Sequence, residues 1–529
     1  MIIVAFITLA FLAIALRNEL RRDLMMFQQN SYRFDRYRRW LSESQDSTSW
    51  MRLTGIVLFF VSLTTFSHPY FSLIASGIFA IVLTYRLSTA KYKKPLVWTA
   101  RAIRIYSTAV VLCLAVAVAV FFIVGGDLFA RVFAATVAML GCYCCSHLTI
   151  VAAAFILIPV EKLIVRRYYN DAARRLASMP DLKIIGVTGS YGKTSTKHFL
   201  HKILSEQFDT VMTPGNFNTT LGVVRTIREN LKPYNEVFIV EMGAKQPGDI
   251  REICDLVHPT MGIITAVGPQ HLESFKTIDN VRDTKFELAD ALPSDGTIIV
   301  NNDFEPAAGR KVSTTKALRY AVRDAKADYR AEDVHYSAAG TTFTVTGPDG
   351  YRLPLSTRLM GECNVSDLLA AVVAARALGV SDDKIKSAVA SIQPVEHRLS
   401  VKKTPSGITI LDDAYNSNPV GSRMALEVLG AMGPGKRIVI TPGMVELGTR
   451  QEELNREFGS VIGRNVDVAI IVAKVNRDAI VEGIKAAGVL PEKDIHTVDT
   501  FAQAQELLAG IVKPGDTVLY ENDLPDTFK

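Results

Sequence analysis

Long apolar runs fill most of the chain up to about residue 160, and shorter apolar runs alternate with amphipathic stretches after it. Each long run is close to the length that crosses the hydrocarbon core of a bilayer as a helix. The pattern predicts five membrane-spanning helices within an α-helical membrane region over residues 1–175. The five runs cover residues 2–16, 53–68, 70–85, 106–124 and 133–160.

Lysine and arginine residues orient these predicted helices. The loops at 17–52, 86–104 and 161–175 are rich in them, whereas the turns at Pro69 and at 125–127 contain almost none. Basic loops stay on the cytoplasmic side of a membrane. An odd number of spans and an outside N-terminus therefore place all three basic loops, and the rest of the chain, in the cytoplasm. We expect an integral protein of the cytoplasmic (inner) membrane.

Charged and sulfur-containing residues add little candidate chemistry to the membrane region. Arg131 and His147 are the only ionisable candidates inside the apolar runs, and helix packing or snorkelling explains them without a transport pathway. The formal net charge of +6 reflects Lys and Arg beside the apolar runs, so nucleic-acid binding is not expected. The six cysteines show neither a disulfide framework nor a zinc-site spacing, which favours a reduced, cytosolic compartment for the later part.

From Asp181 the pattern changes to that of an α/β protein. Short strand-like runs alternate with helix-like stretches such as STKHFLHKILSEQ. This alternation predicts a doubly wound parallel sheet, in which ligands bind at the carboxyl ends of the strands. The stretch VHYSAAGTTFTVTGPDGYRLPL adds antiparallel strands around its PDG turn. The predicted parallel strands are IIGVTG, VFIVEMG, MGIITAVG and TIIVNND.

A second α/β unit begins near Glu396. Helix-like stretches again separate its strand-like runs. We therefore predict a central domain over residues 176–395 and a C-terminal domain over residues 396–529. The predicted strands of the second unit are ITILDDAYN, RIVITPGM, DVAIIVA and DTVLYEND.

A glycine-rich loop with the sequence GVTGSYGKTS, at residues 186–195, is the strongest chemical signal. It follows a predicted strand and opens a predicted helix, which is the arrangement that a triphosphate site requires. Backbone N–H groups would surround the phosphates, Lys193 would neutralise them and the hydroxyl of Thr194 would hold Mg²⁺. The strict P-loop spacing is not met, because Val187 stands at the position of its first glycine.

The string TGSYGKTS resembles the ATP loop of the Mur ligases, the amide-forming enzymes of peptidoglycan precursor assembly. Other motifs of the family follow in the expected order, and the resemblance covers roughly residues 180–529. It implies a P-loop central domain and a Rossmann-like C-terminal domain. Three strings, TPGN, DDAYNSNP and MVELGTRQ, are most similar to the members that add D-alanyl-D-alanine. The supporting motifs are TPGNFNTTLGV (213–223), EMGA (241–244), AVGPQHLESFKTIDNVRDTKFEL (266–288), VEHRL (395–399) and LDDAYNSNP (411–419).

The resemblance also implies a role for individual residues, position by position. It implies four catalytic residues: Lys193, His271, Lys285 and Arg398. The implied ATP-binding residues are Gly189, Ser190, Tyr191, Gly192, Lys193, Thr194, Ser195, Asn364, Arg398 and Asp413. Two Mg²⁺ ions are implied, with the ligands Thr194, Glu241, His271 and Lys285, and Lys285 is expected to be carbamylated because a carbamate turns a cation into an oxygen ligand. The candidate substrate contacts are Asn216, Asn218, Thr219, Asn416 and Asn418.

The activity that the resemblance implies is an ATP-dependent, ADP-forming amide ligation through an acyl phosphate. Its expected substrates are a muramyl-peptide carboxylate, UDP-linked or lipid-linked, and D-alanyl-D-alanine or a similar amine. Membrane lipid and cell-wall assembly proteins are further expected partners. Soluble Mur ligases begin with a uridine-nucleotide-binding domain, and this chain has the membrane region in its place.

Two alternatives to this activity stay open. One is a ligase of the same family that adds amino acids or polyglutamate to another substrate. The other is a membrane-tethered P-loop ATPase or regulator that makes no amide bond.

Overall fold

The computed structural model describes residues 2–44, 46, 49–64, 69–90, 92, 94–337, 340–414 and 417–523. Its chain divides into two compact units. One unit extends to Val165 and the other runs from Arg166 to Asp523. The first is all helical and the second contains every strand of the described chain.

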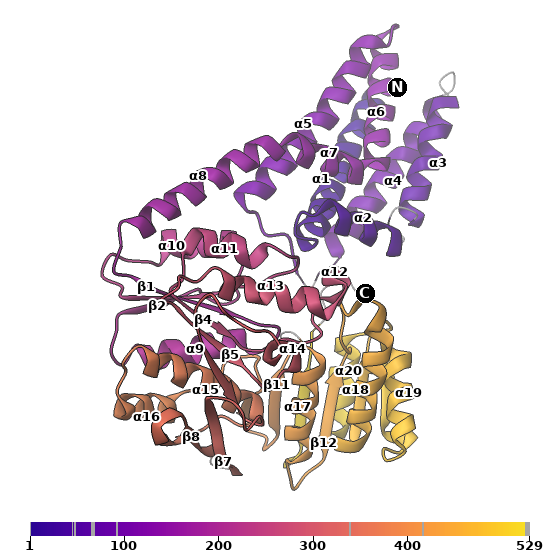
Figure 1. The fold of residues 1–529 in the computed structure, drawn as a ribbon. Coiled ribbons are helices and arrows are strands. Elements are labelled where there is room, and N and C mark those ends of the chain that lie inside the picture. The colour runs from indigo at the N-terminus through magenta and orange to yellow at the C-terminus, as the bar shows by residue number, and fades with distance from the viewer. Residues whose placement is uncertain are drawn as a thin grey trace. The chain divides into compact units, whose positions relative to one another are not determined.

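The first unit is a bundle of helices, most of which are apolar (Figure 1). Among the described residues, three of them are long and apolar enough to cross a membrane: α1, α4 and α5. The shorter apolar helix α3 has 15 residues. The elements are α1 (Ile2–Gln29), α2 (Phe34–Glu43), α3 (Trp50–Thr64), α4 (Pro69–Thr89), α5 (Ala100–Ile123), α6 (Leu128–Cys144), α7 (Ser146–Ile156) and α8 (Ile158–Ala177), which continues into the second unit.

The prediction of one continuous span over residues 133–160 is wrong. Helices α6 and α7 meet at a bend of 79°, and they make a fourth candidate span only if the bent pair is counted as one. The run at 2–16 is also only the first half of a helix of 28 residues, so part of the predicted basic loop at 17–52 is helical.

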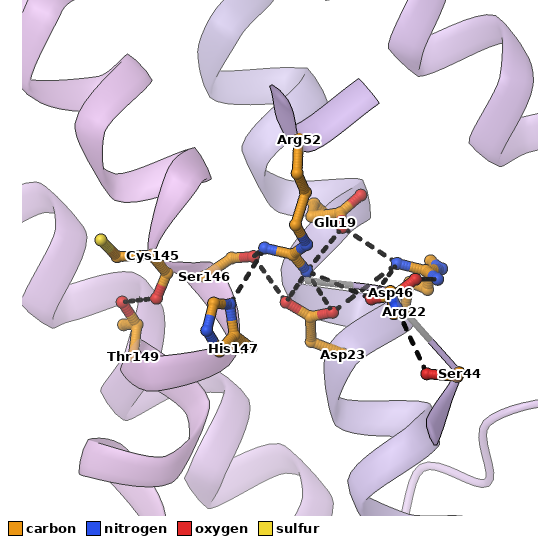
Figure 2. A network of polar contacts seen from close by, with 10 residues as sticks. All are labelled: Glu19, Arg22, Asp23, Ser44, Asp46, Arg52, Cys145, Ser146, His147 and Thr149. Atoms are coloured by element: carbon orange, nitrogen blue, oxygen red, sulfur yellow. Dashed lines mark hydrogen bonds and ion pairs between the residues drawn. The ribbon is translucent and has the colours of Figure 1, made fainter. Parts of the chain in front are cut away.

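A buried network of charged side chains lies inside this first unit (Figure 2). Arg52 on α3 is 1% exposed, and its Nη2 donates to Glu19 Oε1 and to Asp23 Oδ1 on α1, both at 3.0 Å. Its Nη1 donates to Ser146 Oγ at the start of α7, at 3.0 Å. Asp46 joins the network through Arg22. Burying a charge is costly unless it is paired, and here each guanidinium faces carboxylates.

This network adds buried ionisable residues that lie just outside the predicted apolar runs, where Arg131 and His147 were the candidates. His147 does belong to it, because its Nδ1 lies 3.1 Å from Arg52 Nη1. A guanidinium only donates, so Nδ1 accepts and the His147 ring is neutral. The carboxylates of α1 were missed because the helix was expected to end before them.

The larger sheet of the second unit has nine strands in the order β2-β3-β1-β4-β5-β6-β7-β8-β9. Pairing is parallel from β2 to β7 and antiparallel from β7 to β9, which confirms the four predicted parallel strands and the predicted antiparallel extension. The strands are β1 (Lys183–Thr188), β2 (Thr210–Met212), β3 (Val237–Glu241), β4 (Met261–Ile264), β5 (Thr297–Asn301), β6 (Lys316–Ala321), β7 (Tyr329–Ser337), β8 (Gly340–Thr346) and β9 (Arg352–Thr357).

Helices cover both faces of this sheet (Figure 1). Neighbouring residues of β1 point to opposite faces, so Ile185 packs with α9 and α15 while Ile184 packs with α10, α11 and α13. The helices are α9 (Lys193–Leu204), α10 (Thr220–Glu229), α11 (Asp249–Val257), α12 (Leu272–Phe275), α13 (Ile278–Asp290), α14 (Glu305–Ala308), α15 (Glu362–Ala377) and α16 (Asp382–Ser391).

The smaller sheet has six strands in the order β10-β11-β15-β12-β13-β14, and only the β10–β11 pair is antiparallel. Its strands include the four predicted for the second α/β unit. They are β10 (Ser400–Lys403), β11 (Thr409–Asp413), β12 (Arg437–Thr441), β13 (Val468–Val472), β14 (Ile495–Val498) and β15 (Thr517–Glu521). The accompanying helices are α17 (Pro419–Gly430), α18 (Gln451–Asn465), α19 (Arg477–Ala487) and α20 (Phe501–Ile511).

Candidate functional site

The glycine-rich loop joins the carboxyl end of β1 to the start of α9. Gly189 and Gly192 have φ values of 153° and 76°. A Cβ on Gly189 would lie 2.1 Å from Thr265 Oγ1, and a Cβ on Gly192 would lie 2.1 Å from Asp367 Oδ1. Only glycine fits these positions. The loop therefore brings the backbone N–H groups at the start of α9 to the strand ends, where an anion can bind them.

Lys193 lies at the first position of α9 and bends back over the loop. Its Nζ donates to the carbonyl of Gly189 at 2.6 Å and to that of Ser190 at 3.2 Å. Its enclosed position lowers the pKa of Lys193 to about 8, although the charge of Glu241 opposes this shift. The side chain is thus held where it can meet a phosphate bound on the loop.

Glu241, at the end of β3, faces Thr194 from the neighbouring strand. The Thr194 hydroxyl donates to Glu241 Oε1 at 3.2 Å. This closeness follows from the register, because Val187 of β1 pairs with Glu241. A hydroxyl and a carboxylate together fit the oxygen ligands that Mg²⁺ prefers.

Lys197 is a site residue that the sequence analysis missed. It is 0% exposed, and its Nζ donates to Glu241 Oε2 at 2.8 Å and to the carbonyl of Gly215 at 2.7 Å. Asn218 Nδ2 also donates to Glu241, at 3.1 Å. Burial raises the pKa of Glu241, but Lys197 and Asn218 outweigh that effect and hold the pKa below its ordinary value. Glu241 is therefore ionised and tied to the loop that carries Gly215.

His271 and Lys285 come from the segment that follows β4. His271 Nδ1 is hydrogen-bonded to the Glu446 carboxylate, which comes from the loop after β12. Burial lowers the pKa of His271, even though the contact with Glu446 opposes the shift. Lys285 on α13 is 2% exposed, and burial together with the nearby charge of Lys193 lowers its pKa to about 7.

These groups fit a Mg²⁺ site only in part. Within the part of the chain that the structure describes, no three His, Cys, Asp or Glu side chains are grouped to hold a metal. Thr194 with Glu241 would hold one ion at the start of α9. A second ion at His271 would need further oxygen ligands, which phosphate or a carbamate on Lys285 could supply.

A cavity of about 470 Å³ opens beside the glycine-rich loop and is lined by both sheets' loops. It brings together seven of the predicted residues: Tyr191, Gly192, Ser195, Asn364, Arg398, Asp413 and Asn418. Asn364 Nδ2 is hydrogen-bonded to the carbonyl of Met360 at 2.8 Å, which leaves its amide oxygen to accept from a ligand. Burial raises the pKa of Asp413 to about 6, although the charge of Arg398 opposes the shift.

The same cavity contains residues that the sequence analysis did not single out. Asn301, at the end of β5, donates to the carbonyl of Thr265 at 2.8 Å. Phe304 lies 6.2 Å from the Tyr191 ring, measured between ring centroids. A polar strand end after TIIV and an aromatic residue three positions later are the signals that could have identified them.

The predicted substrate contacts fall in different places. Asn218 binds Glu241, whereas Thr219 and Asn418 cap α10 and α17 by accepting from the N–H groups of Gly222 and Gly421. Asn216 lines a second cavity, which does not contain Asn218 or Thr219. Asn416 lies outside the described residues.

Two known protein families match this chain, one over its central α/β domain and one over its C-terminal α/β domain. The Mur ligase middle domain matches residues 187–375, and the "Mur ligase, glutamate ligase domain" matches residues 397–520. A UDP-N-acetylmuramoyl-tripeptide–D-alanyl-D-alanine ligase of Bacillus subtilis is 29% identical over 346 residues, which cover 64% of this chain and 72% of the relative. The enzyme of the same name from Mycobacterium bovis is 30% identical over 366 residues, which cover 64% and 70%.

A solved structure agrees with these relatives. The crystal structure of a MurF ligase from Thermotoga maritima in complex with ADP has a TM-score of 0.60 and 27% identity, and the match covers 68% of this chain and 80% of that one. The two domain matches, the relatives and the shared fold lead to one conclusion. This chain belongs to the Mur ligase family and is an ATP-dependent ligase.

Proposed function

We propose that the protein joins D-alanyl-D-alanine, or a similar amine, to the carboxyl group of a muramyl-peptide precursor at the cytoplasmic face of the membrane. The names of the relatives support this substrate pair. One observation in the structure carries the proposal: Lys193, Thr194 and Glu241 converge at the start of α9, beside the cavity that reaches Arg398.

The proposed chemistry starts from a carboxylate, which is a poor electrophile. Transfer of the γ-phosphoryl group of ATP to this carboxylate gives an acyl phosphate and ADP. The amine then attacks the acyl carbon, and phosphate leaves as the amide bond forms. The protein's task is to position three charged partners and to neutralise them, so no covalent nucleophile of the protein is needed.

Individual side chains divide this task. Lys193 binds the β- and γ-phosphates, and Arg398 reaches the γ-phosphate from the C-terminal domain. Thr194, Glu241, His271 and a carbamylated Lys285 would hold two Mg²⁺, which supply further positive charge when bound. Asn364 and Asp413 contact the nucleoside part of ATP, and the residues of the central P-loop surround its phosphates.

The apolar helices and basic loops support placement of the protein in the cytoplasmic membrane, with the ligase in the cytoplasm. A lipid-linked precursor at the membrane face and a soluble UDP-linked precursor are the two forms of the acid.

Membership of the ligase family removes the alternative of a non-ligase ATPase. A different amine or acid within the family is the second candidate function.

Product mass tests the proposal directly. The purified protein receives ATP, Mg²⁺, D-alanyl-D-alanine and either the UDP-linked or the lipid-linked muramyl tripeptide. We expect a product heavier than the acid by the dipeptide minus one water, with one ADP for each amide bond. The Lys193→Ala variant should keep its fold but form no product. Product formation by that variant would remove the glycine-rich loop from the mechanism.

A further inference from the structure

A second cavity, of about 720 Å³, shares Arg398 in its lining with the nucleotide cavity. Arg398 lines both cavities, and Thr194 lines the second one at the start of α9. The remaining walls are the outer face of α9, the loop at 215–216 and the connecting segment at 391–397. The second cavity therefore reaches two of the residues that we assign to the phosphate end of ATP, and it shares one of them with the nucleotide cavity.

The wall formed by α9 is a row of hydrogen-bonding side chains. Thr194, His198, His201 and Lys202 line the cavity, and the first three lie four and three residues apart, so they share one face of the helix. The row extends for about 12 Å along the helix axis, at 1.5 Å per residue. It leads away from the phosphate end of the nucleotide site.

His198 and His201 are uncharged at neutral pH, and each can form hydrogen bonds with a ligand. Burial lowers the pKa of His198 to about 4, and burial also lowers that of His201. His201 Nε2 lies 3.2 Å from the carbonyl of Thr210, so it donates there and leaves Nδ1 as an acceptor. Lys202 is paired with Glu206 at 2.7 Å. Apolar side chains, among them Phe199 and Ile392, complete the lining.

A lining of neutral hydrogen-bonding side chains and apolar side chains suits a peptide better than a phosphate group. Peptide N–H and C=O groups pair with neutral imidazoles and amides, whereas apolar walls cover side chains. A volume of about 720 Å³ also exceeds what one small amine would fill.

The contacts of the loop at 215–216 indicate which of the substrates would occupy the second cavity. Lys197 Nζ joins the carbonyl of Gly215 to the carboxylate of Glu241, so this wall of the cavity is connected directly to the proposed metal ligand. The group that must meet the γ-phosphate first is the carboxylate of the acid. An acid lying in this cavity would present that carboxylate at Thr194 and Arg398.

We propose that this cavity binds the peptide stem of the carboxylate substrate, with its reacting carboxylate at Thr194 and Arg398 and its stem along His198 and His201. The proposal rests on the proposed function for the identity of the acid. It assigns substrate recognition to the outer face of α9, within the ligase unit itself.

Two variants test this assignment. His198→Ala removes one wall group, and Gln393→Trp narrows the cavity from the exposed connecting segment. We expect each variant to raise KM for the muramyl tripeptide by about tenfold, the effect of losing one good hydrogen bond or contact. KM for ATP and for D-alanyl-D-alanine should stay within twofold of wild type. His335→Ala, an exposed histidine on β7, is the matched control and should change nothing.

Direct binding separates this proposal from the proposed function. Calorimetry measures binding of the UDP-linked tripeptide and, separately, of the lipid-linked tripeptide in detergent, in the presence of a non-hydrolysable ATP analogue, to the wild type and to both variants. Weaker binding by the variants supports the cavity even if no amide product forms in the ligation assay. Unchanged affinity in the variants, absence of wild-type binding of both forms of the tripeptide, or a rise in KM for the dipeptide instead of the acid would overturn it.

Discussion

Lys197 shows how one side chain can join two parts of a site. Its side chain is fully buried and connects Glu241, at the end of β3, to the carbonyl of Gly215, in the loop before α10. Sequence reasoning interprets a lysine in the second turn of an amphipathic helix as a solvated charge. Its partner lies 44 residues away, so nothing near it in the sequence reveals the pair.

Replacing Lys197 with Met should leave the Glu241 carboxylate buried without its cation. Removing one partner of a buried ion pair costs about 3–5 kcal/mol. Thermal unfolding of the ligase unit in the detergent-purified protein measures the loss. Lys202→Met is the control, because Lys202 lies on the same helix as Lys197 and forms a partly exposed pair with Glu206, and such pairs contribute about 0.5 kcal/mol. Equal effects of the two substitutions would contradict the assigned role.

Lys285 provides a prediction in pH. The pKa of Lys285 is about 7 in the folded chain, against an ordinary value of 10.5. Between these two pH values the folded chain binds fewer protons than the unfolded chain. The contribution of Lys285 to stability therefore increases as the pH rises from 7 to 10.5. Only the neutral amine reacts with carbon dioxide. About one tenth of Lys285 is neutral at pH 6 and about nine tenths at pH 8.

We therefore expect carbamate on Lys285 to increase from pH 6 to pH 8. Carbon-13 NMR of protein equilibrated with ¹³C-labelled bicarbonate measures it as a carbamate signal. The Lys285→Arg variant should lack this signal at every pH. A signal of constant intensity across this range, or one that persists in the variant, would contradict the prediction.

At the scale of elements, most strand positions could be predicted, although β2, β6, β10 and β14 were missed, and helix geometry could be predicted only in part. The eight strands predicted for the two α/β units are local patterns of apolar residues, and each matches an observed strand. The bend between α6 and α7 has no such local signal. Ser146, at the bend, donates to Asp23, which is 123 residues away, so the polar partner that favours the bend is invisible in the apolar run itself.

The same limit applies to the candidate site. The glycine-rich loop and the motifs around Glu241, His271 and Arg398 are contiguous strings, so they could be identified from sequence. The contact of His271 with Glu446 joins residues 175 apart and depends on how the two sheets' loops meet. Thr219 and Asn418 carried substrate assignments, and the structure shows them as helix caps.

The buried network of Figure 2 predicts that Arg52 stabilises the packing of α1, α3 and α7. Arg52→Leu would remove one of the two guanidinium groups that face Glu19 and Asp23 and leave these buried carboxylates incompletely paired, at a cost of about 3–5 kcal/mol. Thermal unfolding of the membrane unit, followed by size-exclusion chromatography in detergent, measures this. Arg38→Leu, an exposed position on α2, should be nearly neutral. A stable Arg52→Leu protein would show that the network is not needed for packing.

For the whole molecule, the apolar helices predict firm attachment to the membrane. Carbonate washing should leave the protein in the membrane fraction, and detergent should release it, because buried apolar helices are not held by charge alone. A tag that follows the ligase unit should be protected from protease in intact spheroplasts. Release by carbonate, or cleavage of the tag from outside, would contradict the placement.

The central claim for the molecule is that ATP activates a carboxylate as an acyl phosphate. The most direct measurement uses a muramyl tripeptide whose reacting carboxylate carries oxygen-18, together with ATP, Mg²⁺ and D-alanyl-D-alanine. Mass spectrometry then determines the isotope in the released phosphate. We predict one oxygen-18 atom per phosphate, transferred from the acid as the amide forms. Amide product with unlabelled phosphate would contradict the account.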